Sequence, residues 1–165
     1  MTTPPLITIT LISHNMLHSL KACLASLSAQ TVKDFEIVFI DDRSRDGTRE
    51  WIKNYADPRL RYFRNEHQLG FGGTRNLSLK EACGQYIFFT DADCVAEKNR
   101  LEQGLHAYQK TGSIGIVGKT LPLGNSTKRS DRKVVNQDGR FMTCNMSFKR
   151  EILDKLGGFD PAFDT

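Results

Sequence analysis

Two carboxylates stand one residue apart in YIFFTDADC, residues 86–94, directly after a run of apolar and aromatic residues. If the segment stays extended, Asp91 and Asp93 project to the same side, where their charges repel each other unless a cation neutralises them. Ligands that are all oxygen select a hard ion, Mg²⁺ or Mn²⁺, which keeps one or two protein carboxylates and completes its shell with phosphate oxygens and water. The segment indicates either a metal site or a turn in which the carboxylates only cap backbone N–H groups.

A second pair of carboxylates opens DDRSRDGT, residues 41–48. Turn chemistry accounts for the Asp-Gly step and for Asp46, which can cap a following helix. It does not account for both Asp41 and Asp42. A carboxylate fixed at the end of a strand is well placed to accept an N–H group of a nucleobase, and we assign this role to Asp42.

The glycine-rich stretch LGFGGTRN, residues 69–76, leads into a helical pattern around residues 77–83. A dinucleotide-binding fingerprint would need glycine in place of Arg75 and a position after the first strand, and both conditions fail. Glycines still allow the backbone to approach a ligand closely, and Arg75 adds a cation near a helix N-terminus, where anions are favoured. The stretch predicts a diphosphate site, and a loop with an exposed arginine is the simpler alternative.

These residues sit between elements that can be predicted from the apolar pattern. Predicted strands span residues 6–12, 35–40, 59–65, 86–90 and 114–118, with amphipathic helices between them. This alternation is typical of an α/β fold, a Rossmann-like, mostly parallel sheet with helices on both faces. Ligands bind such sheets at the carboxyl ends of the strands. Polar residues follow four of these ends: Ser13, His14 and Asn15; Asp41 and Asp42; Asn65; Asp91 and Asp93.

Length and charge limit the possible classes of protein. The 165 residues suit a single domain with a sizeable core. A formal charge of +4 argues against a nucleic-acid-binding protein, which needs a denser basic face. The chain has no apolar run of transmembrane length and starts without a secretory signal, so we expect a soluble, cytoplasmic protein. The basic cluster at residues 127–133 is expected to be a solvated loop, with a flap over phosphate or acceptor as the alternative.

The four cysteines give no metal or disulfide pattern. They are Cys23, Cys83, Cys94 and Cys144, and none forms a CxxC pair. This spacing argues against a zinc knuckle and against a disulfide framework. We expect most of them to be small buried hydrophobic residues.

Taken together, four stretches of the sequence resemble one family. They are ITITLISHN (7–15), LKACLASLSAQTVKDFEIVFIDDRSRDGT (20–48), LGFGGTRNLSLKEACGQYIFFTDADC (69–94) and CNMSFKREILDKLGGFD (144–160). In this order they resemble the inverting glycosyltransferases of family 2, which have the GT-A fold. Each stretch alone is a weak signal, whereas the combination covers nearly the whole chain and is specific.

The resemblance implies a nucleotide-sugar donor, usually a UDP-sugar, and a divalent cofactor, Mn²⁺ or Mg²⁺. It implies a hydroxyl acceptor on a glycan, a lipid-linked glycan or another molecule, as in polysaccharide or cell wall biosynthesis. Many relatives work at membranes, so peripheral membrane association is compatible with a cytoplasmic location. By position, the resemblance assigns Ser13, His14 and Asn15 to the wall of the base and ribose, Asp42 to the base, Arg75 to the nucleotide, Asp91 to the ribose or a metal-bound water, and Asp93 to the metal.

The sequence departs from the family pattern at three places. His14 stands where the family often has Tyr, and Cys94 stands where an acidic residue often follows the DxD motif. The family's catalytic base is the Asp of a Glu-Asp pair shortly after a GGFD-like segment, and these residues contain no Glu-Asp pair. We therefore expect the base beyond Thr165, and residues 1–165 to form a donor-binding domain without the acceptor part.

Three alternatives were weighed against this interpretation. A nucleotidyltransferase would carry its GTR-type loop after the first strand, and a dehalogenase-like phosphatase would carry its DxD motif on the first strand. Both placements fail in this sequence. A nucleotide-sugar-binding domain without catalysis remains the alternative to a transferase, because no base can be assigned.

Overall fold

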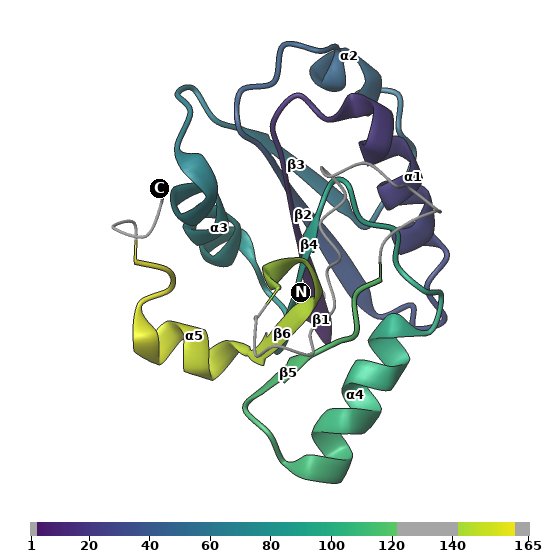
Figure 1. The fold of residues 1–165 in the computed structure, drawn as a ribbon, viewed down its shortest axis with the longest axis vertical. Helices are drawn as coiled ribbons and strands as arrows, with labels where there is room; N and C mark the ends of the chain where they lie inside the picture. Colours follow the sequence, from purple (N-terminus) through teal and green to yellow (C-terminus); the bar gives the residue numbers. More distant parts are fainter. Residues whose placement is uncertain (1–2, 122–141, 161–165) are drawn as a thin grey trace.

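The protein is described here by a computed structural model of residues 3–121 and 142–160, in which a central sheet is flanked by helices (Figure 1). The strands of this described part are β1 (Ile7–Ser13), β2 (Phe35–Asp41), β3 (Leu60–Arg64), β4 (Tyr86–Asp91), β5 (Gly115–Val117) and β6 (Met146–Lys149). The helices are α1 (Leu17–Ser28), α2 (Thr48–Ile52), α3 (Gly70–Glu81), α4 (Arg100–Thr111), α5 (Arg150–Leu156) and the short 3-10 helix η2 (Thr143–Asn145).

The strand order in the sheet is β3-β2-β1-β4-β6-β5. Strand β1 pairs in parallel with β2 and β4, and β2 pairs in parallel with β3. Only β6 runs antiparallel, to β4 on one side and β5 on the other. The mostly parallel α/β sheet predicted from the sequence is therefore confirmed. The order reverses at β1, which is where ligands bind in such sheets.

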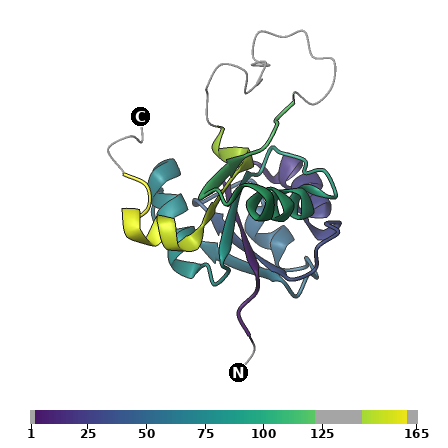
Figure 2. The same ribbon diagram turned by 90° about the horizontal axis from the view of Figure 1, so that it is seen from below.

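One face of the sheet is covered by α1, α2 and α4 (Figure 2). Alternate residues of β1, namely Ile7, Ile9 and Leu11, are fully buried in this layer together with leucines of α1. Side chains in a strand alternate between its faces, so the residues between them belong to the other layer. The near-continuous apolar character of β1 and β2 follows from this coverage on both sides.

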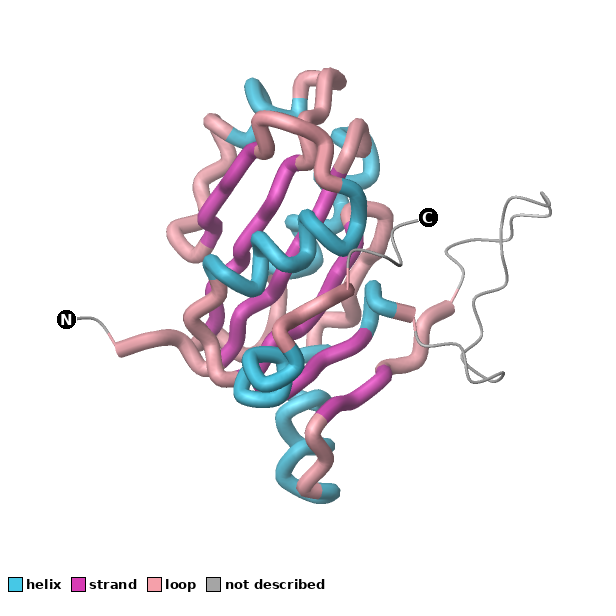
Figure 3. The backbone as a smooth tube through the Cα atoms, turned by 90° about the vertical axis from the view of Figure 1, so that its left-hand side faces the viewer, coloured by secondary structure: helices cyan, strands magenta, loops and turns pink. Residues whose placement is uncertain are grey.

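The opposite face is covered by α3 and α5, and α3 crosses the strands in Figure 3. Here Ile12, Val38 and Ile40 pack against Leu77 of α3. Helix α3 is thereby fixed over β1 and β2, and its first turn comes close to the carboxyl end of β2. The sequence predicted this helix around residues 77–83, whereas α3 begins earlier, at Gly70.

The cysteines are all free, and Cys23 and Cys144 are buried as expected. Cys94 is partly buried and Cys83 is exposed, so the prediction of small buried residues holds for two of the four. No helix within residues 3–121 and 142–160 has both the length and the apolar composition needed to cross a bilayer. The basic cluster at 127–133 lies outside the described residues.

Candidate functional site

The carboxyl ends of four parallel strands lie next to each other, as the sequence predicted. In the register of β1 with its neighbours, Ser13 pairs with Asp41 of β2 and Ile12 pairs with Asp91 of β4. The backbone N–H of Asn65, after β3, donates to the carbonyl of Asp41 (2.9 Å). The polar residues that follow these strands are therefore brought together by strand pairing itself.

Of the two adjacent carboxylates after β2, Asp41 is structural. It is fully buried and accepts hydrogen bonds from the Ser44 backbone N–H (2.8 Å) and from the Tyr62 hydroxyl (2.8 Å). Burial, and then the bond to this carboxylate, raise the pKa of Tyr62. Arg64 adds a cation 3.5 Å from the same carboxylate. The turn after β2 therefore accounts for Asp41.

Asp42 joins β2 to the N-terminus of α3. Its Oδ1 accepts from Asn65 Nδ2 (2.6 Å) and from the Leu69 backbone N–H (2.9 Å), and its Oδ2 accepts from the Gly70 N–H (3.2 Å). The two backbone donors belong to the first turn of α3, so the carboxylate caps that helix. Asp42 is only 5% exposed. Oδ1 thus accepts two hydrogen bonds and Oδ2 accepts one, so an N–H group of a nucleobase would bond to Oδ2.

The residues after β1 tie the first two strand ends together. His14 Nδ1 lies 2.7 Å from the Asp42 carbonyl, which only accepts, so Nδ1 carries the proton and Nε2 accepts from Asn15 Nδ2 (2.9 Å). Asn15 adopts a left-handed φ of 53°. Its N–H donates to Ser44 Oγ, and its Oδ1 accepts from the Arg45 N–H. His14 and Asn15 are thereby fixed at the rim of the site.

At these strand ends, two buried polar atoms have neither a hydrogen-bond partner nor an ionic partner in the described part of the chain. They are Ser13 Oγ and Asn65 Oδ1. A buried polar atom without a partner is costly, and such atoms are found where a ligand or water completes the bonding. Ser13 was predicted as a site residue from the sequence, whereas Asn65 was noted only for its place after β3.

Arg75 reaches from α3 to the end of β4. The stretch around it is the first part of α3, and the Arg75 side chain is 12% exposed, so the alternative of a loop with an exposed arginine is wrong. One guanidinium nitrogen, NH2, lies 3.2 Å from Asp91 Oδ1 and 3.0 Å from Thr143 Oγ1. The aromatic rings of Phe71 and Phe159 lie 5.6 and 5.8 Å from the guanidinium carbon. Arg75 is therefore held between α3, β4 and η2.

Asp91 is the last residue of β4 and Asp93 lies in the turn that follows, so the prediction that both stand in one extended segment is wrong. The Cys94 N–H donates to the Asp91 carbonyl (3.1 Å), which closes the turn. The Ala92 side chain is fully buried in the core, and the chain bends directly after β4 where this side chain packs. Burial raises the pKa of Asp91, the Arg75 cation opposes this rise, and the charge of Asp93 adds to it. Asp93 itself is exposed.

The two carboxylates fit a hard cation only with help from a ligand. Within the described residues, no three His, Cys, Asp or Glu side chains are grouped to hold a metal ion. Mg²⁺ and Mn²⁺ are commonly held by one or two carboxylates together with substrate phosphates. Asp91 already pairs with Arg75, so Asp93 is the more accessible ligand. The donor set fits an ion that arrives with a diphosphate.

Sequence reasoning missed two contributors to this region, Thr143 and Arg100. Thr143 lies in η2 and accepts from Arg75, but it is far from Asp91 along the chain. Arg100 begins α4 and donates to the Phe89 carbonyl (2.6 Å) and to Asn145 Oδ1 (2.9 Å). The sequence showed Arg100 only as part of an amphipathic helix, so no local signal revealed these contacts.

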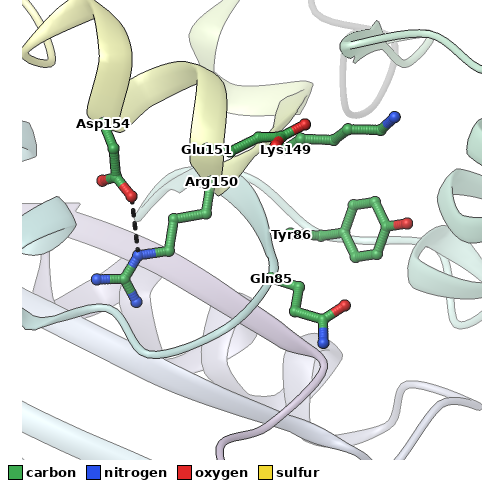
Figure 4. A pocket seen from close by; sticks show the side chains of 6 residues that line it. All are labelled: Gln85, Tyr86, Lys149, Arg150, Glu151 and Asp154. Atoms are coloured by element: carbon green, nitrogen blue, oxygen red, sulfur yellow. Dashed lines mark ion pairs between the residues drawn. The ribbon is translucent and has the colours of Figure 1, made fainter.

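Among the described residues, two shallow cavities are lined mostly by residues other than the predicted ones, and Asn15 alone of the predicted residues lines either of them. One, of about 400 Å³, is at the amino end of β4 and is lined by Gln85, Tyr86, Lys149, Arg150, Glu151 and Asp154 (Figure 4). In it Arg150 pairs with Asp154 at 3.5 Å. The other, of about 500 Å³, borders Asn15 and the start of α1. The strand-end chemistry therefore identifies the candidate site better than cavity size does.

Comparison with known proteins identifies relatives over most of the chain. The family model described as "Glycosyl transferase family 2" matches residues 8–159. Two Escherichia coli proteins, WfgD and WfaP, are both named UDP-Glc:alpha-D-GlcNAc-diphosphoundecaprenol beta-1,3-glucosyltransferase. They are 31% and 33% identical to this chain over 74% and 92% of its residues. The matches cover 48% and 62% of those proteins, so the chain spans between about half and three fifths of their length.

Solved structures share the fold. Residues 1–349 of TarS from S. aureus superpose with a TM-score of 0.80 at 20% identity, over 96% of this chain and 51% of that TarS chain. The mannosyltransferase PcManGT from Pyrobaculum calidifontis, solved with GDP-Man and Mn²⁺, superposes with a TM-score of 0.77 at 21% identity, over 97% of this chain and 49% of that protein. The predicted GT-A fold is confirmed.

Proposed function

This chain belongs to glycosyl transferase family 2, and we propose that it binds the UDP-sugar donor of a glycosyl transfer at the carboxyl ends of β1, β2 and β4. The observation that carries this proposal is the meeting of Arg75, Asp91 and Asp93 where the strand order reverses. The two E. coli relatives are named for UDP-Glc, and TarS has been solved with UDP. These names support a uridine nucleotide for this chain as well.

In this proposal the diphosphate lies between the Arg75 guanidinium and Asp93. Arg75 uses one nitrogen for Asp91 and Thr143 and keeps further N–H groups for phosphate oxygens. The Arg75 cation is held before the donor arrives, so it stabilises the charge on the leaving diphosphate without reorganisation. A divalent ion held by Asp93, with Asp91 beside it, would supply further neutralisation of that charge.

The base and ribose are assigned to the opposite side of the site, near β1 and β2. Ser13 Oγ and Asn65 Oδ1 are buried polar atoms there that find no hydrogen-bond partner among residues 3–121 and 142–160. His14 and Asn15 wall the same region through their bonds to the loop after β2. Asp42 contributes the remaining capacity of Oδ2 and fixes the start of α3.

The reaction that this geometry serves is a single in-line displacement at the anomeric carbon of the donor. The acceptor hydroxyl oxygen forms the new bond, the nucleoside diphosphate leaves, and the anomeric configuration inverts. No base is assigned within the described residues; a general base that takes the proton of the acceptor hydroxyl would contribute about 10²–10⁴-fold to the rate. Likeness to WfgD and WfaP favours a lipid-linked glycan as the acceptor.

Calorimetric titration of UDP tests the donor site. The unaltered chain is titrated with Mn²⁺ and, separately, with EDTA, and the pair is repeated for Asp93→Ala. We expect Mn²⁺ to strengthen UDP binding at least about tenfold, because the ion bridges carboxylate and diphosphate, and Asp93→Ala to remove that gain. Because Asp93 is exposed, the variant should stay folded.

Asp34→Ala is the matched control for this titration. Asp34 is also an exposed carboxylate, but it precedes β2 at the other end of the sheet. It should leave the Mn²⁺ effect intact. Equal Mn²⁺ effects in the unaltered chain and in Asp93→Ala would contradict the metal site, and absence of UDP binding with and without Mn²⁺ would contradict the donor site as a whole.

A further inference from the structure

Arg100 is a cation enclosed by the fold beside the candidate site. Its guanidinium donates to the Phe89 carbonyl, to Thr90 Oγ1 and, through Nε, to Asn145 Oδ1. The ring of Phe88 lies 5.8 Å from the guanidinium carbon. Although the residue as a whole is only partly buried, burial is the largest influence on this group and lowers the pKa of Arg100. Every one of these partners belongs to β4 or η2.

Arg75 and Arg100 thus form two bridges between the same two segments. Arg75 joins Asp91, the last residue of β4, to Thr143 of η2. Arg100 joins the two residues before Asp91 to Asn145, at the other end of η2. The arginines come from α3 and α4, which lie on opposite faces of the sheet (Figure 2). Both arginines therefore tie η2 to β4, in addition to the pairing of β6, which follows η2 directly, with β4.

The surroundings of Arg100 are unusual for an enclosed cation. In residues 3–121 and 142–160 it forms no ion pair. An enclosed charge without a carboxylate partner is costly, and an apolar side chain of similar size would avoid that cost. A residue that only filled space here would not need a guanidinium.

We propose that Arg100 is a positioning residue of the donor site: it fixes the end of β4 against η2, so that Asp91 and Asp93 are placed to hold the divalent ion that arrives with the diphosphate. This inference rests on the proposed function. Arg100 does not touch the donor and acts through Thr90 and Asn145. Residues that hold metal ligands in place without touching the metal commonly affect metal affinity strongly.

Two substitutions separate the charge of Arg100 from its geometry. Arg100→Lys keeps the cation but loses the planar fork that serves three acceptors, and Arg100→Met loses both. We expect Arg100→Met to weaken UDP binding in Mn²⁺ by about 10–100-fold, Arg100→Lys to weaken it less, and both to leave UDP binding in EDTA within about twofold. A loss confined to the metal-dependent part is a result that general destabilisation does not give.

Asn145 provides a second route to the same test. Asn145→Ala removes the acceptor of Arg100 Nε and should also weaken UDP binding in Mn²⁺. Since both changes break one bridge, the double variant Arg100→Met/Asn145→Ala should lose less than the product of the two single losses. Amide hydrogen exchange in residues 142–149 should accelerate in each variant, because η2 is held less firmly.

Arg59→Met is the matched control. Arg59 donates to a backbone carbonyl, as Arg100 does, and in addition to the Asp57 carboxylate, but it lies directly before β3, away from the site. It should lower thermal stability without changing UDP affinity. The inference is overturned if Arg100→Met binds UDP in Mn²⁺ as tightly as the unaltered chain does. Should Arg100→Met not fold, the same result in Arg100→Lys and in Asn145→Ala overturns it. Equal losses in Mn²⁺ and EDTA would overturn it too, and failure of the unaltered chain to bind UDP would instead contradict the proposed function on which it rests.

Discussion

At the scale of single residues, the side chains of the candidate site hold each other before any ligand binds. Arg75 pairs with Asp91 at 3.2 Å, and their side chains are 12% and 31% exposed. In the proposed site, this ion pair joins the cation that we assign to the phosphates to a carboxylate that we assign to the metal. A diphosphate that arrives with its ion offers each group a new partner, so the exchange costs less than breaking the pair alone.

This exchange predicts opposite effects of Arg75→Met on two ligands. UDP binding in Mn²⁺ should weaken by about 10–100-fold, because charged hydrogen bonds to the diphosphate are lost. Binding of Mn²⁺ alone should be unchanged or tighter, because Asp91 is released from its ion pair. Electron paramagnetic resonance of Mn²⁺, with and without UDP, measures both. Weaker binding of Mn²⁺ alone would show that the arginine supports the metal rather than competing with it.

At the scale of elements, Asp42 is the link between a strand and the helix that carries Arg75. Its carboxylate caps α3 through the Leu69 and Gly70 N–H groups. This cap also explains how a helix can begin with glycines, each of which costs about 1 kcal/mol relative to alanine in a helix. The position of Arg75 along α3 depends on where that helix starts.

Asp42→Asn tests whether this cap also serves the nucleotide. An amide keeps one acceptor oxygen, so the free energy of unfolding should fall by about 1–2 kcal/mol and UDP affinity should fall with it. Urea unfolding and calorimetry measure the two effects. Asp46→Asn is the control, because Asp46 bonds the backbone N–H groups of Leu17 and Thr48 at other helix starts. Lost stability with unchanged UDP affinity would make Asp42 a cap only.

The elements also show what could be predicted from sequence. The strands β1, β2 and β4 are near-continuous apolar runs, so their number, order along the chain and polar ends were evident. Strand β6 has only four residues and gains its place by pairing with β4, for instance Phe148 with Ile87, so its own sequence gave no sufficient signal. The DxD turn was missed because the burial of Ala92 is a tertiary effect. The contacts of Arg100 join residues far apart in sequence and follow only from the assembled sheet.

At the scale of the whole molecule, the candidate site lies at the carboxyl ends of the parallel strands. A separate network of hydrogen bonds around Asp57 lies at the opposite end of the sheet. Asp57 bonds Arg59 at 2.8 Å and accepts from Ser28 Oγ at 2.7 Å, which links the loop before β3 to the end of α1. The Asp57 side chain is 6% exposed. The bond from Arg59, more than any other influence, holds the pKa of Asp57 well below its usual range.

This lowered pKa predicts how stability changes in acid. The Asp57 contribution is fully present above the unfolded-state pKa of about 4 and is lost as the pH falls below it towards the folded-state value. Between pH 7 and pH 3, the unaltered chain should lose about 1–2 kcal/mol more of its unfolding free energy than Asp57→Asn. Urea unfolding at the two pH values provides the comparison. Equal losses in both proteins would exclude Asp57 as a source of acid sensitivity.

The most direct measurement of the donor site is anomalous diffraction from crystals grown with UDP and Mn²⁺. We expect the manganese peak beside Asp93, bridged to the diphosphate, with Arg75 turned towards the phosphate oxygens and the uracil near Ser13 and Asn65. A nucleotide bound instead in the cavity beside Tyr86 (Figure 4), or a manganese peak away from Asp91 and Asp93, would contradict a donor site at the strand ends.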